Sequence, residues 1–125
     1  MNIDFFEVNG VCIAQIESDD IIIRDVRDAL DVLSECYSSG ANSIIIDEKN
    51  IIPDFFDLKN GLAGEILRKF SMYHFKIAII GDFSDVSSKS LRAFIYESNR
   101  AGDTCFVHSA EEAKERLVHI NKARP

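Results

Sequence analysis

The chain has 125 residues, of which 46% are hydrophobic, and a formal net charge of −7. This length and composition suit one hydrophobic core, so we expect a single domain covering residues 1–125. The acidic balance argues against nucleic-acid binding, which requires clustered Lys and Arg side chains to neutralise phosphates. No apolar run approaches the roughly 20 residues that span a bilayer, and the N-terminus lacks signal-peptide features. We therefore expect a cytoplasmic protein that binds no membrane.

The chain begins with two runs rich in Ile, Val and Phe, at residues 3–8 and 11–16. Asn9-Gly10 separates the two runs, and Asn-Gly in this setting is the strongest short-range signal of a β-hairpin. We therefore assign residues 1–17 to an opening hairpin.

The rest of the chain alternates helix patterns with strand patterns. Apolar residues at three-and-four spacing predict amphipathic helices, and short, continuously apolar runs predict strands buried on both faces of a parallel sheet. Expected N-caps are Asp25, Asp57, Ser87 or Ser88, and Ser109, the last in a capping box with Glu112. In chain order we predict a helix at 26–37, a strand at 43–47, a helix at 58–72, a strand at 76–81, a helix ending near 102, a strand at 104–107, and a helix from 110 to about 120. Residues 121–125 are predicted to be a disordered tail.

These elements predict an α/β fold of order ββαβαβαβα, with a mixed, mostly parallel sheet and flanking helices. The order and several local phrases resemble the STAS domain, the fold of anti-sigma-factor antagonists and of the cytoplasmic tails of sulphate transporters. The phrases are the strand at 44–47, Asp57-Leu58-Lys59-Asn60-Gly61-Leu62 at the start of a helix, and the segment 107–113. The resemblance implies a STAS-like regulatory domain with a surface for a partner protein.

The phosphorylation switch of the antagonists uses a serine in an Asp-Ser-Ser-Gly-Leu type motif. The matching positions here are Asp57, then Leu58-Lys59-Asn60, then Gly61-Leu62, so no hydroxyl group occupies the switch position. We expect a domain without the phosphoserine switch. The chain also looks like a group of small bacterial proteins known only as a domain of unknown function, which share segments of the FFDLK, GLAGEIL and FIYESN types.

The segment PDFFDLKNGLAG, residues 53–64, is the first candidate site. A hydrophobic staple would pack Phe56 on the fourth helical position, but that position is Gly61, so Phe55 or Phe56 must pack in the core or against another molecule. Gly61 and Gly64 leave a helix face without side chains, which suits close packing within the fold or the approach of a ligand or subunit. Aromatic residues flanked by charges are typical of interface hot spots. The candidate partner-binding residues are Phe55, Phe56, Asp57, Lys59, Asn60, Gly61, Gly64, Tyr73 and Tyr96.

An alternative site lies where a parallel sheet places its ligands, at the carboxyl ends of the strands. This hypothesis makes the chain a small-ligand-binding protein or an enzyme with an acidic cleft. Its residues are Asp47, Glu48, Asp82, Asn99 and Arg100. Arg100 also suits the negative end of a helix without any ligand.

The sequence predicts no catalytic residue, no metal site and no cofactor. His74, His108 and His119 are too far apart for a metal-ligand motif, and neither a GxSxG elbow nor a glycine-rich nucleotide motif is present. The three cysteines form no CxxC pair and are expected to be free and buried. We favour a noncatalytic protein-interaction domain whose partner is unknown. The exposed sheet edge of the opening hairpin makes a homodimer a further expectation.

Overall fold

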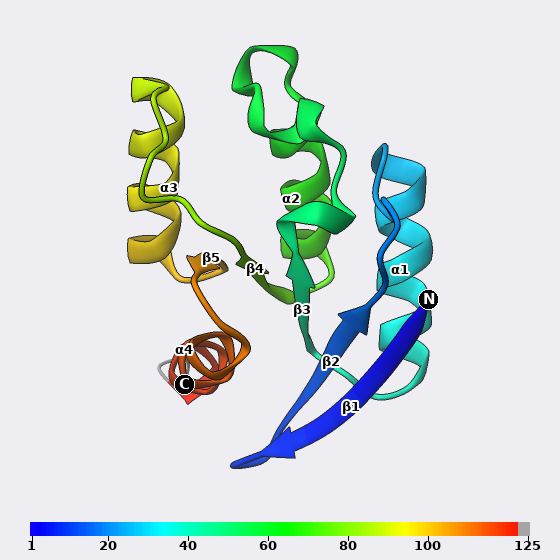
Figure 1. Ribbon diagram of the computed structural model, residues 1–125. Coiled ribbons are helices and arrows are strands. Elements are labelled where there is room, and N and C mark those ends of the chain that lie inside the picture. The colour runs from blue at the N-terminus through cyan, green and yellow to red at the C-terminus, as the bar shows by residue number, and fades with distance from the viewer. Residues whose placement is uncertain (123–125) are drawn as a thin grey trace.

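A computed structural model of the chain, described here for residues 1–122, contains one mixed sheet of five strands and four α-helices (Figure 1). The strands lie in the order β1-β2-β3-β4-β5, with β1 antiparallel to β2 and the others parallel. This architecture confirms the predicted α/β fold. The strands are β1 Asn2–Val8, β2 Val11–Glu17, β3 Ser43–Asp47, β4 Lys76–Ile80 and β5 Thr104–Val107, and the helices are α1 Val26–Ser38, α2 Leu62–Met72, α3 Lys89–Ala101 and α4 Ala110–Lys122.

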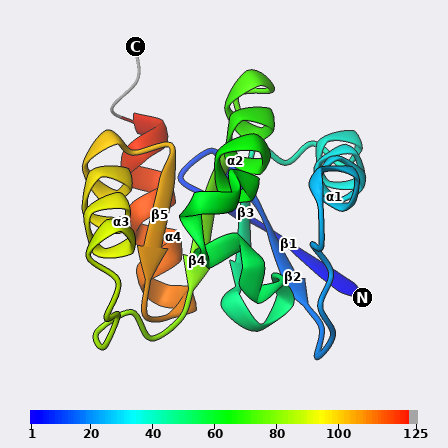
Figure 2. The same cartoon turned by 90° about the horizontal axis from the view of Figure 1, so that it is seen from above.

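The helices cover both faces of the sheet. Because the order β2-β3-β4-β5 always advances in one direction, right-handed crossovers place α1, α2 and α3 on the same face. The last helix, α4, follows β5 and covers the opposite face (Figure 2). The loops after β2, β3, β4 and β5 therefore meet at the end of the sheet where these parallel strands terminate. We call this end the carboxyl edge; it is distinct from the outer strands β1 and β5.

Two groups of buried side chains fill the space on either side of the sheet. Successive side chains of a strand point to opposite faces. Thus Ile44 and Ile46 of β3 lie in the cluster that includes Phe70 of α2. Ile45, between them, packs in the cluster that includes Leu117 of α4. The continuous apolar run in β3 is explained by burial on both faces.

The opening hairpin forms as predicted. Asn9 and Gly10 both have positive φ angles, of 51° and 82°. Two such residues make a two-residue turn whose twist matches that of the flanking strands. Val8 and Val11 close the turn as a directly paired couple.

Local capping fixes three of the helix starts. Asp25 accepts a hydrogen bond from the Asp28 amide at 2.8 Å, and Ser88 accepts one from the Leu91 amide. Ser109 accepts one from the amide of Glu112 at 3.1 Å. These are the predicted caps.

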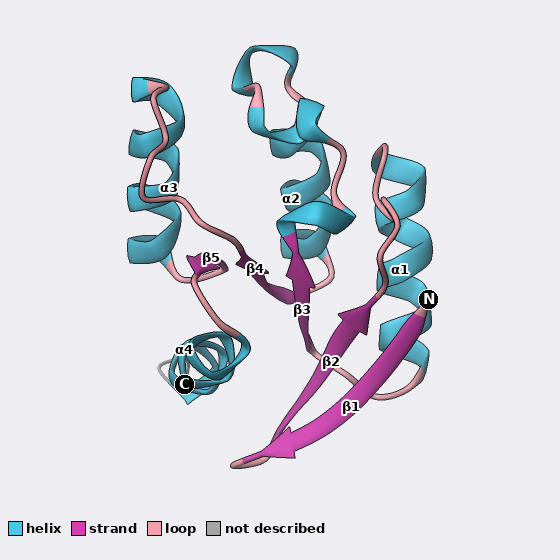
Figure 3. Cartoon of the chain, in the orientation of Figure 1, coloured by secondary structure: helices cyan, strands magenta, loops and turns pink. Residues whose placement is uncertain are grey.

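The predicted helix at 58–72 is shorter in the structure, because α2 begins at Leu62. Two 3-10 turns, η2 Pro53–Phe56 and η3 Leu58–Asn60, precede it (Figure 3). Gly61 has a left-handed φ of 77° and separates η3 from α2. Asp57 makes no side-chain capping hydrogen bond, so its predicted role as an N-cap is wrong.

The last helix extends further than expected. It continues through Lys122, and its Asn121 side chain donates hydrogen bonds to the Leu117 carbonyl at 2.6 Å and to the Ser43 hydroxyl. Residues 121 and 122 are therefore helical, whereas the rest of the predicted tail, 123–125, lies outside the described residues. None of the helices in residues 1–122 combines the length and the apolar composition that a membrane-spanning helix requires.

Candidate functional site

The two adjacent phenylalanines of the PDFF segment have different environments. Phe55 is 2% exposed and belongs to the core cluster between the sheet and the helices. Phe56 is half-buried and meets Phe55 edge to face, with ring centroids 5.0 Å apart. Phe55 is therefore a core residue and cannot contact a partner directly, while Phe56 reaches the surface.

Phe56 lines a shallow surface hollow at the carboxyl edge. The loop after β3 and the start of α3 form its walls, and its volume is about 830 Å³. Its lining combines apolar groups with hydroxyls and with one charge of each sign. We call it the Phe56 hollow; it is lined by Pro53, Phe56, Asp57, Leu58, Lys59, Ser88 and Ser90.

A chain of aromatic contacts supports the floor of the Phe56 hollow. The ring of Phe56 lies 6.2 Å from that of Phe83, and Phe83 meets Phe106 of β5 edge to face at 5.2 Å. Phe94 of α3 also packs on Phe106, with ring centroids 6.0 Å apart. Such aromatic pairs contribute about 0.5–1.5 kcal/mol each beyond the area they bury. The rings join the loop after β3 to the sheet, so the surface is built on packed elements.

Asn60, another candidate, stabilises the loop at residues 53–64 through its side-chain hydrogen bonds. Its side-chain amide donates to the Asp54 carbonyl at 2.8 Å, and its side-chain oxygen accepts from the Leu62 amide at 2.9 Å. These bonds close the loop and satisfy one of the free amides at the start of α2. Asn60 thus takes over the capping role that the sequence assigned to Asp57.

The glycines do not serve close packing within the fold. A Cβ atom added at Gly61 or Gly64 would meet no other atom within 4 Å. Gly61 is explained by its left-handed backbone, but Gly64 has no such requirement. Both line a second shallow hollow of about 470 Å³, together with Val26 of α1 and the residues Glu65, Arg68 and Lys69 of α2. The open space at both glycines argues against close packing, and the approach of a ligand or subunit stays a prediction.

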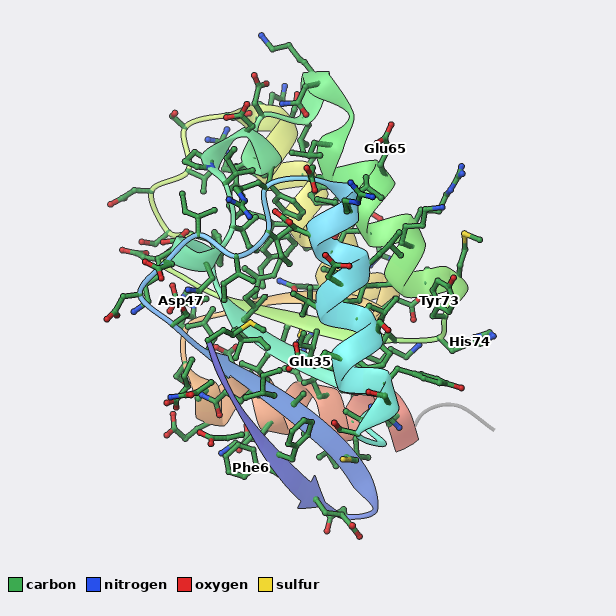
Figure 4. The ribbon with its side chains drawn as sticks, turned by 90° about the vertical axis from the view of Figure 1, so that its right-hand side faces the viewer. Phe6, Glu35, Asp47, Glu65, Tyr73 and His74 are labelled. Atoms are coloured by element: carbon green, nitrogen blue, oxygen red, sulfur yellow. The ribbon has the colours of Figure 1, made fainter. Side chains whose placement is uncertain are left out.

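The two candidate tyrosines lie apart from the Phe56 hollow. Tyr73 is 53% exposed and, with Tyr37, lines a groove between α1 and α2. Tyr96 is 63% exposed on α3, where the Arg100 guanidinium lies 5.7 Å from its ring centroid. In Figure 4, Tyr73 and Asp47 lie on opposite sides of the molecule. The structure therefore distributes the predicted partner-binding residues over more than one surface.

The acidic residues of the alternative site are partly brought together. Asp47 lines a hollow of about 290 Å³ at the carboxyl edge, with Glu17 and Asp19 from the end of β2 and the loop after it. We call it the acidic hollow. Its carboxylate also accepts a hydrogen bond from the Lys49 amide at 3.0 Å. Nearby, the Glu48 carboxyl lies over Gly81, where an added Cβ would come within 2.7 Å of its Cδ.

Asp82, after β4, is held by its own loop. Its carboxylate accepts from the Ser84 hydroxyl at 2.6 Å and from the Ser84 amide at 3.1 Å. The side-chain hydrogen bond from Ser84 is the main cause that lowers the pKa of Asp82. The carboxylate is exposed, and its observed bonds account for its position in a turn.

Asn99 and Arg100 do not join the acidic hollow, which corrects the grouping predicted from sequence. Both lie in the last turn of α3, ten and eleven residues after Lys89, where the helix starts at the carboxyl edge. With a rise of about 1.5 Å per residue, this places them roughly 15 Å from that edge. Asn99 instead accepts a hydrogen bond from the Phe106 amide at 2.8 Å, and Arg100 pairs with Glu97 at 3.5 Å.

Sequence reasoning missed Asn50, which organises the acidic hollow. Asn50 is 1% exposed, and its side-chain amide donates to the carbonyls of Ser18 at 2.8 Å and Asp20 at 2.9 Å. Its own carbonyl accepts from the amides of Ile22 and Ile23. The only signal in the sequence was a polar residue next to the apolar pair Ile51-Ile52, which does not reveal contacts more than 25 residues away.

Within residues 1–122, no group of three or more His, Cys, Asp or Glu side chains is placed to hold a metal ion.

Comparison with curated proteins and with solved structures gave no match. A family model, described as a domain of unknown function (DUF4180), matches residues 8–117. This match agrees with the predicted likeness to a domain of unknown function. The chain belongs to the DUF4180 family.

Proposed function

We propose that this chain is a noncatalytic regulatory domain that docks a partner protein in the Phe56 hollow. The observation that carries the proposal is the half-buried Phe56 ring, open to solvent in a hollow and backed by packed aromatic rings. Aromatic residues of this kind, surrounded by polar groups, dominate the binding energy of many interfaces. Asp57 and Lys59, both exposed, add one charge of each sign at the rim.

The proposed class of function also draws on the resemblance to STAS domains. The observed element order, a hairpin followed by alternating helices and strands, is the order on which that resemblance rests. The segment that corresponds to the antagonists' switch is the loop that carries Phe56. Since it has no hydroxyl group between Asp57 and Gly61, we propose a docking surface that operates without phosphorylation at this position.

The alternative, ligand binding in the acidic cleft predicted around Asp47, has less support. Two of its five predicted residues, Asn99 and Arg100, lie at the far end of α3 and have partners within the fold. Asp47 and Asp82 each accept hydrogen bonds from their own turns. We therefore place the docking function in the Phe56 hollow.

Affinity purification with the immobilised full chain, from an extract of the cells that produce it, tests the proposal. Phe56→Ser removes the aromatic anchor, and Lys59→Glu reverses an exposed charge at the rim of the Phe56 hollow. Lys49→Glu is the matched control, because it makes the same change at an exposed lysine of the acidic hollow. Bound proteins are quantified by mass spectrometry, and circular dichroism verifies that each variant is folded.

We expect one protein to be retained by the wild-type chain and by Lys49→Glu, and to be lost with the other two variants. Loss of an interface hot spot of about 2 kcal/mol corresponds to an affinity about 30-fold lower. Equal retention by all four chains would show that the Phe56 hollow is not a docking surface. Loss with Lys49→Glu alone would transfer the function to the acidic hollow around Asp47.

A further inference from the structure

The outer edge of β1 carries backbone groups that face away from the sheet. In a hairpin with a two-residue turn, the closing pair Val8 and Val11 exchanges hydrogen bonds, and the pairs then alternate along the strands. The groups of Ile3, Phe5 and Glu7 therefore point outward. Strand β2 shows the same alternation. Cys12, which lies opposite Glu7, directs its carbonyl away from β1 and accepts a hydrogen bond from the Asn42 amide at 3.0 Å on the β3 side.

The opposite edge of the sheet, at β5, is capped by a side chain at Phe106. The Phe106 amide donates to the side-chain oxygen of Asn99 at 2.8 Å, and the Asn99 amide group lies 3.5 Å from the Phe106 carbonyl. Arg116 of α4 in turn donates to the Asn99 carbonyl at 2.7 Å. Among the described residues, no comparable side chain caps the outward groups of β1, so the two edges of the sheet differ. An uncapped edge is a template for another strand.

We propose that β1 pairs with β1 of a second copy of this chain, antiparallel and about a two-fold axis at Phe5. Phe5 is the middle residue of the seven-residue strand Asn2–Val8, and it is also the middle one of the three outward-facing residues. With the axis at Phe5, Ile3 of each copy pairs with Glu7 of the other, and Phe5 pairs with itself. This register uses every outward amide and carbonyl of both strands, whereas an axis at Ile3 or Glu7 leaves some unpaired.

The side chains of β1 fit this register on the face that carries α1. Phe5 is 43% exposed, so much of its apolar surface is in contact with solvent. Across the axis, the two Phe5 rings lie opposite each other and cover one another's exposed surface. Directly opposed aromatic residues on paired strands stabilise the pairing relative to alanine.

The opposite face supplies charge complementarity. Asp4 is exposed and has no ion pair among the described residues. In this register it lies directly opposite Phe6 of the second copy, in a pair with Cα atoms about 4.5 Å apart. The ammonium of Lys114 lies 4.0 Å from the centroid of the Phe6 ring, and Figure 4 shows Phe6 beside α4. Lys114 also lacks a carboxylate partner in the described chain, so Asp4 of each copy meets Lys114 of the other.

The complementary charges of Asp4 and Lys114 are the reason for proposing a second copy as the occupant of this edge. A generic strand would satisfy the backbone groups, but the two-fold axis also presents one Asp4 to each Lys114 and one Phe5 to the other. The β1 surface is distinct from the Phe56 hollow, so self-association and partner docking are independent proposals. Failure of either leaves the other intact.

Charge reversal with mixing tests the proposal. Asp4→Lys places two lysines against each other in the homodimer, and Lys114→Asp places two aspartates against each other. In a mixed dimer of the two variants, both contacts again join opposite charges. Native mass spectrometry of the full chain, at tens of micromolar protein, distinguishes the three dimers by mass, and circular dichroism verifies the fold of each variant.

We expect a wild-type dimer, a loss of dimer for each variant alone, and a mixed dimer when the two are combined. A misfolded variant or an effect within one chain would not be rescued by mixing. Phe5→Lys provides a second test, since it opposes two charges at the axis; Tyr37→Lys, at another exposed aromatic residue, should leave the dimer unchanged. A monomeric wild-type chain, or variants that dimerise as well as the wild type, would overturn the proposal.

Discussion

Replacing Asn50 should destabilise the loop between β2 and α1 and with it the whole carboxyl edge. This buried side chain holds the carbonyls of Ser18 and Asp20, while its backbone carbonyl accepts from Ile22 and Ile23. Asn50→Ala removes both side-chain hydrogen bonds and leaves two partly buried carbonyls without a donor. Each net hydrogen bond contributes about 1 kcal/mol, so we expect a loss of about 2–3 kcal/mol in the free energy of unfolding.

A second substitution separates the hydrogen bonds from the packing. Asn50→Asp keeps the size of the side chain but, when ionised, directs a carboxylate at the two carbonyl oxygens. The pKa of the introduced carboxyl is then higher in the folded chain than in the unfolded chain. The Asn50→Asp chain is therefore most stable at a pH below the pKa that the carboxyl has in the unfolded chain. Its stability decreases as the pH rises through the pKa of the carboxyl in the folded chain. Asn50→Ala should show no such additional pH dependence.

Urea unfolding followed by circular dichroism measures these differences as shifts of the midpoint at constant slope. Asn2→Ala is the control, since Asn2 is an exposed asparagine near the chain end with no side-chain hydrogen bond to the described residues. A loss of unfolding free energy below about 0.5 kcal/mol for Asn50→Ala is within the range of ordinary surface substitutions. It would refute the conclusion that the Asn50 hydrogen bonds stabilise the loop between β2 and α1. An Asn50→Asp chain as stable as the wild type at neutral pH would refute it equally.

Two further predictions follow from pKa values. Burial raises the pKa of the Cys36 and Cys105 thiols to about 11. Iodoacetamide at neutral pH should therefore modify the half-buried Cys12 first. Equal rates of modification at all three cysteines, measured by peptide mass mapping, would contradict this burial. Ser84→Ala should raise the lowered pKa of Asp82 toward its ordinary value, as measured by NMR titration of the carboxyl group. The stability that Asp82 contributes above its unfolded pKa, and loses as the pH falls through its folded pKa, should then decrease; an unchanged titration would show that Ser84 is not the cause.

The sequence by itself determined most of the secondary structure, because its signals are local. Asn9-Gly10 specifies a two-residue turn whatever surrounds it, and the apolar run at 43–47 can be buried on both faces only inside a covered sheet. The caps Asp25 and Ser88 act on amides three residues away. Right-handed crossovers then leave little freedom in the placement of the helices.

Only the tertiary structure decided which residues share a surface. Phe55 and Phe56 are neighbours of the same chemical type, yet Phe55 packs in the core cluster with residues of β3, α2 and β4, while Phe56 reaches the surface. Asn99 and Asp82 both follow plausible ligand patterns, yet the length of α3 separates them. Burial and distance depend on contacts between segments far apart in the chain, such as that of Asn50 with Ser18. Periodicity and capping, which act over a few residues, carry no information about such contacts.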